Sequence, residues 1–180
     1  MPFGLLLSGL TLLVSMMGQS NPQITPLMPV LASPLLSSHV CILMVAYSLL
    51  AFTFFNGLTS VLLPLFVRRD PQRREQIDLQ LADVTRLLLY PALFCMAAGI
   101  FIGAIWANVS WGRYWGWDPK EVWALITLLV YSFALHTQSL PWFRRPRHLH
   151  LFMVLAFLAV LMTYFGVNFL LGGMHSYANS

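Results

Sequence analysis

Long apolar runs, almost free of charge, constrain the fold of this chain more than any other feature. Runs at residues 39–67, 87–108, 119–140 and 150–172 each reach the roughly 20 residues that a helix needs to cross a bilayer. Only 9% of the residues are charged, against about 25% in soluble domains. Because a backbone in lipid must satisfy its own hydrogen bonds, such runs fold as helices. We therefore expect an all-α, polytopic transmembrane helix bundle with about four full spans.

The remaining segments connect or precede these spans. A short apolar segment at residues 2–17 adds an N-terminal piece to the bundle, and a loop rich in Pro and Ser follows at 18–38. The mixed-charge stretch 75–86 is amphipathic, and we expect it to lie on the membrane surface. With no repeat and no soluble segment, residues 1–180 are interpreted as a single integral membrane domain.

Most of the basic residues lie in two short stretches, 68–86 and 144–147, which predict the orientation of the chain. Loops rich in Lys and Arg stay on the cytoplasmic side. The segment 106–121, the 18–38 loop and the C-terminal tail then face the outside. Since topology explains the net charge of +4, we expect no nucleic-acid partner.

The outward segment 106–121 is dense in aromatic side chains: Trp106, Trp111, Tyr114, Trp115 and Trp117. Such a group suits a large flat ligand. The alternative is an interfacial belt, because Trp and Tyr also collect at bilayer surfaces.

Two histidines, His39 and His175, are expected to emerge on the same face as these aromatic residues. Histidine is the commonest haem-iron ligand, and a pair can hold the iron from both sides. The alternative for each is an ordinary polar residue at a helix end. Because both histidines are expected at the same membrane face as the aromatic group, we favour a flat, iron-bearing ligand.

His136 is expected to lie deeper, roughly 22 Å along the helix from Glu121. An ionisable side chain inside a bilayer indicates a functional site. The alternative is a neutral histidine bonded to a neighbouring helix or lying near the inner interface. If His136 binds iron, it needs a second haem site, because it lies at a different depth from His39. The other iron ligand of that site could come from another chain.

The run Asp118-Pro-Lys-Glu predicts a helix start, with Asp118 as N-cap and Glu121 at the third position. Arg113 and Lys120 are the cations of the outer face. They are placed to meet carboxylates such as haem propionates, or else lipid headgroups.

Residues 111–121, Trp-Gly-Arg-Tyr-Trp-Gly-Trp-Asp-Pro-Lys-Glu, resemble the WWD signature of haem-handling proteins. The ending Trp-Asp-Pro-Lys-Glu resembles the CcsA (ResC) branch more than it resembles CcmC or CcmF. CcsA is the membrane subunit of the system II cytochrome c synthetase. Ser-Ser-His-Val at 37–40 and Gly-Gly-Met-His-Ser-Tyr at 172–177 resemble the segments that carry the two external histidines. The resemblance covers roughly residues 25–177, although family members usually have more N-terminal helices than the segment 2–17.

This resemblance implies a residue-level site. His39 and His175 would be the axial ligands of an external haem, and His136 would bind haem on its way across the membrane with a histidine from a CcsB (ResB) partner. The residues implied to form the platform beneath the external haem are Trp111, Trp115, Trp117 and Asp118.

The implied function is cytochrome c biogenesis. The chain would present haem b for thioether attachment to an apocytochrome carrying Cys-x-x-Cys-His, as the haem-binding subunit of a holocytochrome c synthase, with thiol-reducing proteins as further partners. Its place would be the bacterial inner membrane or the plastid thylakoid, with His39, His175 and the WWD loop on the periplasmic or outer side. The alternatives are a CcmC-like haem carrier that hands haem to a chaperone, a b-type electron-transfer subunit, or a transporter with an aromatic cage.

Overall fold

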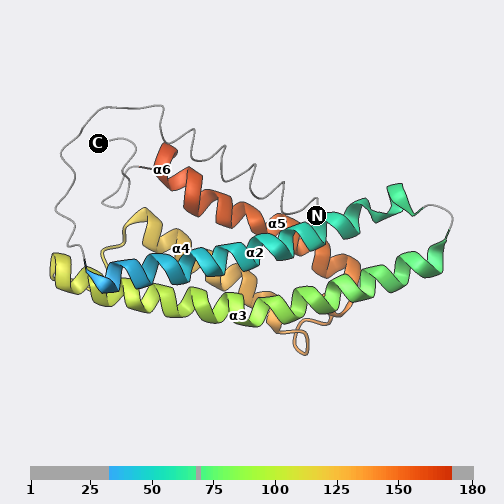
Figure 1. Ribbon diagram of the computed structural model, residues 1–180, viewed down its shortest axis with the longest axis horizontal. Coiled ribbons are helices and arrows are strands. Elements are labelled where there is room, and N and C mark those ends of the chain that lie inside the picture. The colour runs from blue at the N-terminus through green and yellow to red at the C-terminus, as the bar shows by residue number, and fades with distance from the viewer. Residues whose placement is uncertain (1–32, 68–69, 172–180) are drawn as a thin grey trace.

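The structure is a computed structural model that describes residues 33–67 and 70–171, and every regular element in these residues is a helix (Figure 1). The predicted all-α fold is therefore confirmed. The apolar segment 2–17, most of the predicted loop 18–38 and the C-terminal tail lie outside the described residues. The elements in chain order are α2 (Pro34–Phe66), α3 (Pro71–Trp111), α4 (Pro119–Ser132), η1 (Phe133–Leu135), η2 (Pro141–Arg144), α5 (Pro146–Leu161), the π-helical turn η3 (Met162–Gly166) and α6 (Val167–Leu170).

Among the described residues, three helical segments are long and apolar enough to cross a membrane: α2, α3 and the continuous stretch Pro146–Phe169. The expected span 119–140 is shorter than predicted, because α4 has 14 residues, about 21 Å. The helix tightens at its end, where the His136 N–H donates to the carbonyl of Phe133 at 3.1 Å. The Leu140 N–H then closes a turn on the His136 carbonyl at 2.8 Å.

The amphipathic stretch 75–86 and the expected span 87–108 form one continuous helix, since both lie within the 41-residue α3. Asp70 caps its start by accepting the Arg73 N–H at 2.9 Å. Its charged residues are themselves good helix formers, so the change in polarity near residue 86 does not break the helix. The helix ends at Gly112, whose φ of 72° is the left-handed conformation that glycine adopts without steric cost.

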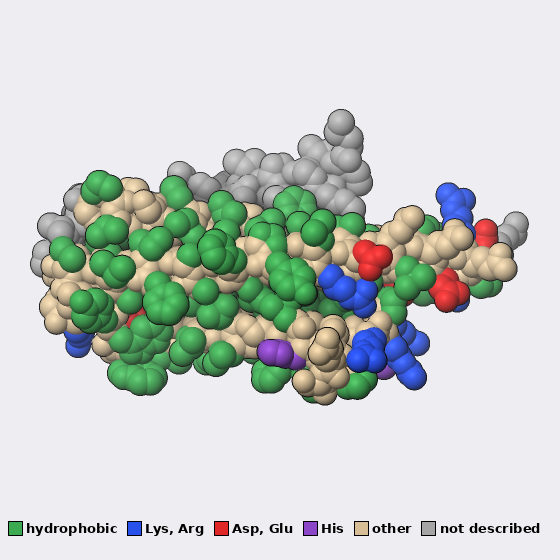
Figure 2. Space-filling view, turned by 90° about the horizontal axis from the view of Figure 1, so that it is seen from below, with side chains coloured by type: hydrophobic (Ala, Val, Ile, Leu, Met, Phe, Trp, Pro, Cys, Tyr) green, Lys and Arg blue, Asp and Glu red, His purple; other side chains and the backbone are tan. Residues whose placement is uncertain are grey.

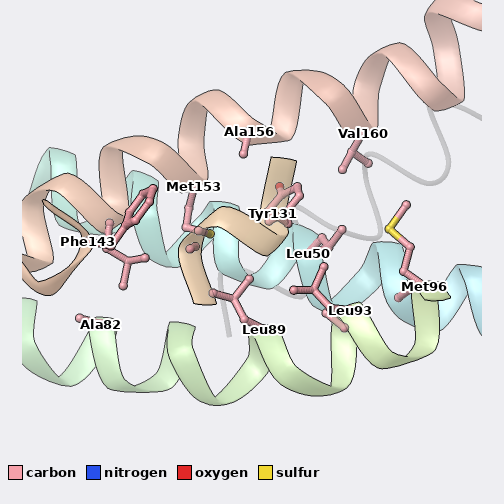
Figure 3. Packing of buried hydrophobic residues seen from close by; sticks show 14 of the residues in the cluster. Leu50, Ala82, Leu89, Leu93, Met96, Tyr131, Phe143, Met153, Ala156 and Val160 are labelled. Atoms are coloured by element: carbon pink, nitrogen blue, oxygen red, sulfur yellow. The ribbon is translucent and has the colours of Figure 1, made fainter. Parts of the chain in front are cut away.

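A core of apolar side chains joins α2, α3, α4 and α5 (Figure 3). Tyr131 of α4 is fully buried at its centre, among Leu50 of α2, Leu89 of α3 and Met153 of α5. Small residues such as Ala46 and Ala92 lie in the same cluster. Small side chains let helix backbones approach closely, which is how helices associate in a bilayer.

Charged side chains gather toward the end of the molecule where α2 passes to α3, while apolar side chains cover most of the rest of the face shown in Figure 2. The guanidinium of Arg86 donates to the carbonyl of Arg144 at 3.2 Å, so the two basic stretches meet at this end. The start of α2, the end of α3 and the start of α4 lie at the opposite end (Figure 1). The two basic stretches and the aromatic segment therefore occupy opposite ends of the bundle.

Candidate functional site

A cavity of about 340 Å³ lies at the end of the bundle remote from the two basic stretches. This volume is within the range of ligand pockets in proteins, roughly 300–1,000 Å³. Its walls come from α2, α3, the loop 112–118, α4 and the turn η3 with α6. The lining includes His39, Leu43, Tyr47, Ile100, Gly103, Trp106, Tyr114, Trp115, Lys120, Glu121, Thr163, Tyr164 and Asn168.

His39 lies in the second turn of α2 and faces α3. Its Nδ1 is 2.7 Å from the carbonyl oxygen of Gly99. Its ring also lies against Gly103, since a Cβ built on that glycine would be 2.5 Å from Nδ1. His39, the predicted iron ligand, is thus part of the cavity wall and lies against Gly99 and Gly103 of α3.

The aromatic segment 106–121 is not one loop, because α3 continues through Trp111. Trp106 is 2% exposed and packs edge-to-face on Trp111, with ring centroids 4.9 Å apart. Trp115 and Trp117 pack edge-to-face at 6.2 Å. Trp106 and Trp115 line the cavity, whereas Trp117 is 75% exposed and Trp111 is outside the lining. The φ of Trp117 is 55°, a strained conformation for a residue with a side chain.

The predicted start of α4 is confirmed as a capping box. Asp118 is 5% exposed and accepts the Lys120 N–H at 3.1 Å. Glu121 reaches back, and its Oε2 accepts the N–H of Asp118 at 3.2 Å and of Gly116 at 2.8 Å. Asp118 therefore caps the start of α4 and is outside the cavity lining, whereas Glu121 and Lys120 are part of it.

The two outer cations differ in position. Lys120 lines the cavity, where burial lowers the pKa of its ammonium group and the Asp118 carboxylate opposes this shift. The Arg113 guanidinium lies over Gly116 instead, since a Cβ there would be 3.2 Å from its Nε. Of the two, the described structure brings only Lys120 into the cavity lining.

The other two predicted histidines are not part of this cavity as described. His136 is exposed and lies in the turn after η1, near the charged end of the bundle. The neighbouring Thr137 carbonyl accepts a hydrogen bond from Arg144 Nε at 3.1 Å. His175 lies outside the described residues.

Several residues that line the cavity or contact His39 are not predicted from the sequence. Gly99 and Gly103 carry a visible signal, since two glycines one turn apart mark a close approach of helices in a membrane. The wall formed by Thr163, Tyr164 and Asn168 carries none. It depends on the π-helical turn η3, a rare element that is frequent at functional sites.

Comparison with known proteins identifies the family of this chain. The cytochrome c assembly protein family matches residues 1–175 of the chain. Protein NrfI of Wolinella succinogenes is 41% identical over 97% of this chain and 19% of its own length. The cytochrome c biogenesis protein CcsA of Chlamydomonas reinhardtii is 32% identical over 86% of this chain and 44% of its own length.

CcsA of Guillardia theta is 34% identical, over 88% of this chain and 59% of its own length. The chain thus spans about a fifth of NrfI and about half of these CcsA proteins. Because the family match extends over nearly the whole chain and the relatives exceed 30% identity, this membrane protein belongs to the cytochrome c assembly protein family.

Proposed function

We propose that the chain holds haem b, as a substrate, in the cavity beside His39 and presents it for covalent attachment to apocytochrome c. One observation carries the proposal: the His39 imidazole, the rings of Trp106 and Trp115 and the Lys120 ammonium line the same cavity. An iron ligand, flat apolar walls and a cation for a propionate are the groups that haem requires. The residues present therefore fit haem.

The second axial ligand in this proposal is His175. Tyr164 and Asn168, in the last described helical segment, line the cavity, and His175 follows Asn168 by seven residues in the sequence. With both sides of the iron ligated, the haem plane is fixed and its vinyl groups are held in one orientation. Orientation of this kind lowers the barrier of a reaction between two partners by removing most of its entropic cost.

The attachment itself is an addition. Each thiol of a Cys-x-x-Cys-His apocytochrome forms a carbon–sulfur bond to one vinyl carbon, and its proton is transferred to the other vinyl carbon. No electron is gained or lost, so both thiols have to be reduced, which is the role proposed for thiol-reducing partners. The incoming histidine of the apocytochrome then displaces one axial ligand, which permits release of the product.

Delivery of haem to the cavity is proposed to begin at the opposite end, near His136. A CcsB (ResB)-like membrane subunit would supply the other ligand there. The exposed position of His136 at the charged end suits a contact with another chain. In this arrangement the cavity end, with His39, His175 and the aromatic segment, faces the periplasm or its plastid equivalent.

A CcmC-like carrier, which releases haem to a chaperone without attaching it, is the alternative function. The Pro119-Lys120-Glu121 sequence favours attachment, because it is the part that resembles the CcsA branch. A b-type electron-transfer subunit is less favoured, since His150, which is buried within α5, bonds the Asp78 carbonyl at 3.3 Å rather than facing a second histidine.

The test is a haem spectrum of the full chain purified with its membrane partner, compared with His39→Ala and His175→Ala. His148→Ala is the matched control, because that ring stacks on Trp142 at 4.5 Å, away from the cavity. We expect both cavity variants to lose bound haem and to regain it with added imidazole, while the control is unchanged. Wild-type spectra from both variants would exclude the assignment. In His136→Ala we expect less haem at the outer site, because delivery is impaired. Haem that is added to the protein should still bind there normally.

A further inference from the structure

The interaction between His39 and α3 determines more than the position of the ring. A carbonyl oxygen can only accept a hydrogen bond, so at 2.7 Å from Gly99 O the Nδ1 atom of His39 must be the donor. In the neutral imidazole only one nitrogen carries hydrogen. The lone pair that can bind a metal therefore belongs to Nε2.

The same contact fixes the rotation of the ring. Gly103 lies one turn after Gly99 on α3, and a Cβ at this position would be 2.5 Å from Nδ1 and 3.2 Å from Nε2 of His39. No residue with a side chain can occupy this position without displacing the ring. The surface of α3 at Gly103 is thus the recess in which the imidazole lies.

We propose that Gly99 and Gly103 are positioning residues that present Nε2 of His39 to the haem iron. Gly99 supplies the acceptor that selects the tautomer, and Gly103 supplies the space that selects the rotamer. Hydrogen bonding of the remote ring nitrogen is how proteins orient histidine ligands and raise their basicity. The inference rests on the proposed function, because it takes His39 as a haem ligand.

Gly103→Ala is the direct test, with Phe101→Ala as its control on the same helix. The Phe101 side chain is 72% exposed and is outside the cavity lining. Both variants carry alanine at the changed position, so the helix propensity there is the same. The change at Phe101 leaves the contacts of His39 with Gly99 and Gly103 in place.

We expect Gly103→Ala to bind haem about tenfold or more weakly, with loss of the low-spin spectrum and recovery on adding imidazole. Phe101→Ala should keep the wild-type spectrum. A wild-type spectrum in Gly103→Ala would overturn the inference. If His39→Ala also keeps the wild-type spectrum, the proposed function fails with it; if His39→Ala loses haem, the inference alone fails.

Two measurements separate positioning from misfolding. In the His39→Ala background the recess is empty, so adding Gly103→Ala should cause no further loss of haem; an additive loss would overturn the inference. The second measurement is an NMR spectrum of haem-free protein labelled with ¹⁵N-histidine. The His39 signals are identified by their absence from the spectrum of His39→Ala, and they should show a protonated Nδ1 and an unprotonated Nε2. The opposite tautomer would contradict the role of Gly99.

Discussion

Glu121 and Gly116 are joined by a 2.8 Å hydrogen bond from the backbone N–H of the glycine to Oε2 of the carboxylate. The same oxygen accepts the Asp118 N–H at 3.2 Å. One side chain of α4 therefore fixes the position of the loop that contains Trp115. This relationship makes the shape of the cavity depend on a residue whose sequence pattern indicated only a helix cap.

We expect Glu121→Ala to loosen the loop and to weaken haem binding, because two backbone donors lose their acceptor. Loss of a capping interaction costs about 1 kcal/mol of helix stability. Glu121→Gln keeps an oxygen acceptor in the same place and should retain most of the binding. Haem titration and thermal unfolding of both variants test this. Equal loss in the two variants would show that the negative charge, rather than the hydrogen bonds, is required.

Trp115 and Trp117 should differ in their effects on haem, although they are two residues apart in the sequence. Trp115 lines the cavity, whereas Trp117 is 75% exposed and strained at a φ of 55°. Trp115→Ala should reduce haem content strongly, and Trp117→Ala should reduce it little. Trp117→Gly should relieve about 1 kcal/mol of backbone strain. Haem content and melting temperature of the three variants check these expectations, and equal haem loss for both alanine variants would contradict them.

Lys120 gives the site a predicted pH dependence. Burial lowers the pKa of its ammonium group from the ordinary value of 10.5, so its charge is lost at a lower pH than for a free lysine. Attraction for a haem propionate should follow the charge and decline as the pH rises through this lowered pKa.

Lys120→Ala should weaken haem binding at neutral pH by about tenfold, which corresponds to about 1.5 kcal/mol for a charge-assisted hydrogen bond. Lys120→Arg stays charged throughout and should remove the decline at alkaline pH. Haem titrations between neutral and alkaline pH distinguish the three proteins. A decline that persists unchanged in Lys120→Arg would assign it to another group.

The sequence predicts local features of this protein well and non-local ones poorly. The cap at Asp118 and Glu121 depends on four consecutive residues, and the structure has it as predicted. The continuity of α3 was missed because its charged first part was interpreted as a boundary, whereas charge affects solvation more than helix formation. The early end of α4 at Ser132 and the contact of His39 with Gly99 depend on turns and packing between distant segments, which no short pattern encodes.

Gly57 illustrates a position where the addition of one methyl group should be costly. A Cβ there would be 2.7 Å from the backbone carbonyl oxygen of His150, so α2 and α5 would have to separate. Overpacking of this kind costs about 1–3 kcal/mol, more than the gain of up to about 1 kcal/mol in helix propensity. We expect Gly57→Ala to lower the melting temperature in detergent. Gly99→Ala, whose new Cβ would lie nearest to the side chain of Leu43 rather than to a backbone atom, should lower it less, and equal melting temperatures for the two variants would contradict the argument.

The hydroxyls of Thr127 and Thr163 lie 2.9 Å apart and join α4 to the π-helical turn η3. A hydroxyl has one proton, and the carbonyls of Ala159 at 2.8 Å and Trp123 at 3.2 Å are alternative acceptors for the proton of Thr163. Valine replaces threonine with nearly the same shape, so Thr127→Val, Thr163→Val and the double variant form a cycle that measures this contact. Interhelical hydrogen bonds in membranes average about 0.6 kcal/mol, with a maximum of about 1.7 kcal/mol. We expect a coupling energy in this range from unfolding in detergent, together with weaker haem binding in Thr163→Val, because Thr163 and the adjacent Tyr164 line the cavity. Strictly additive effects would show that the two hydroxyls act separately and that the turn is held by packing alone.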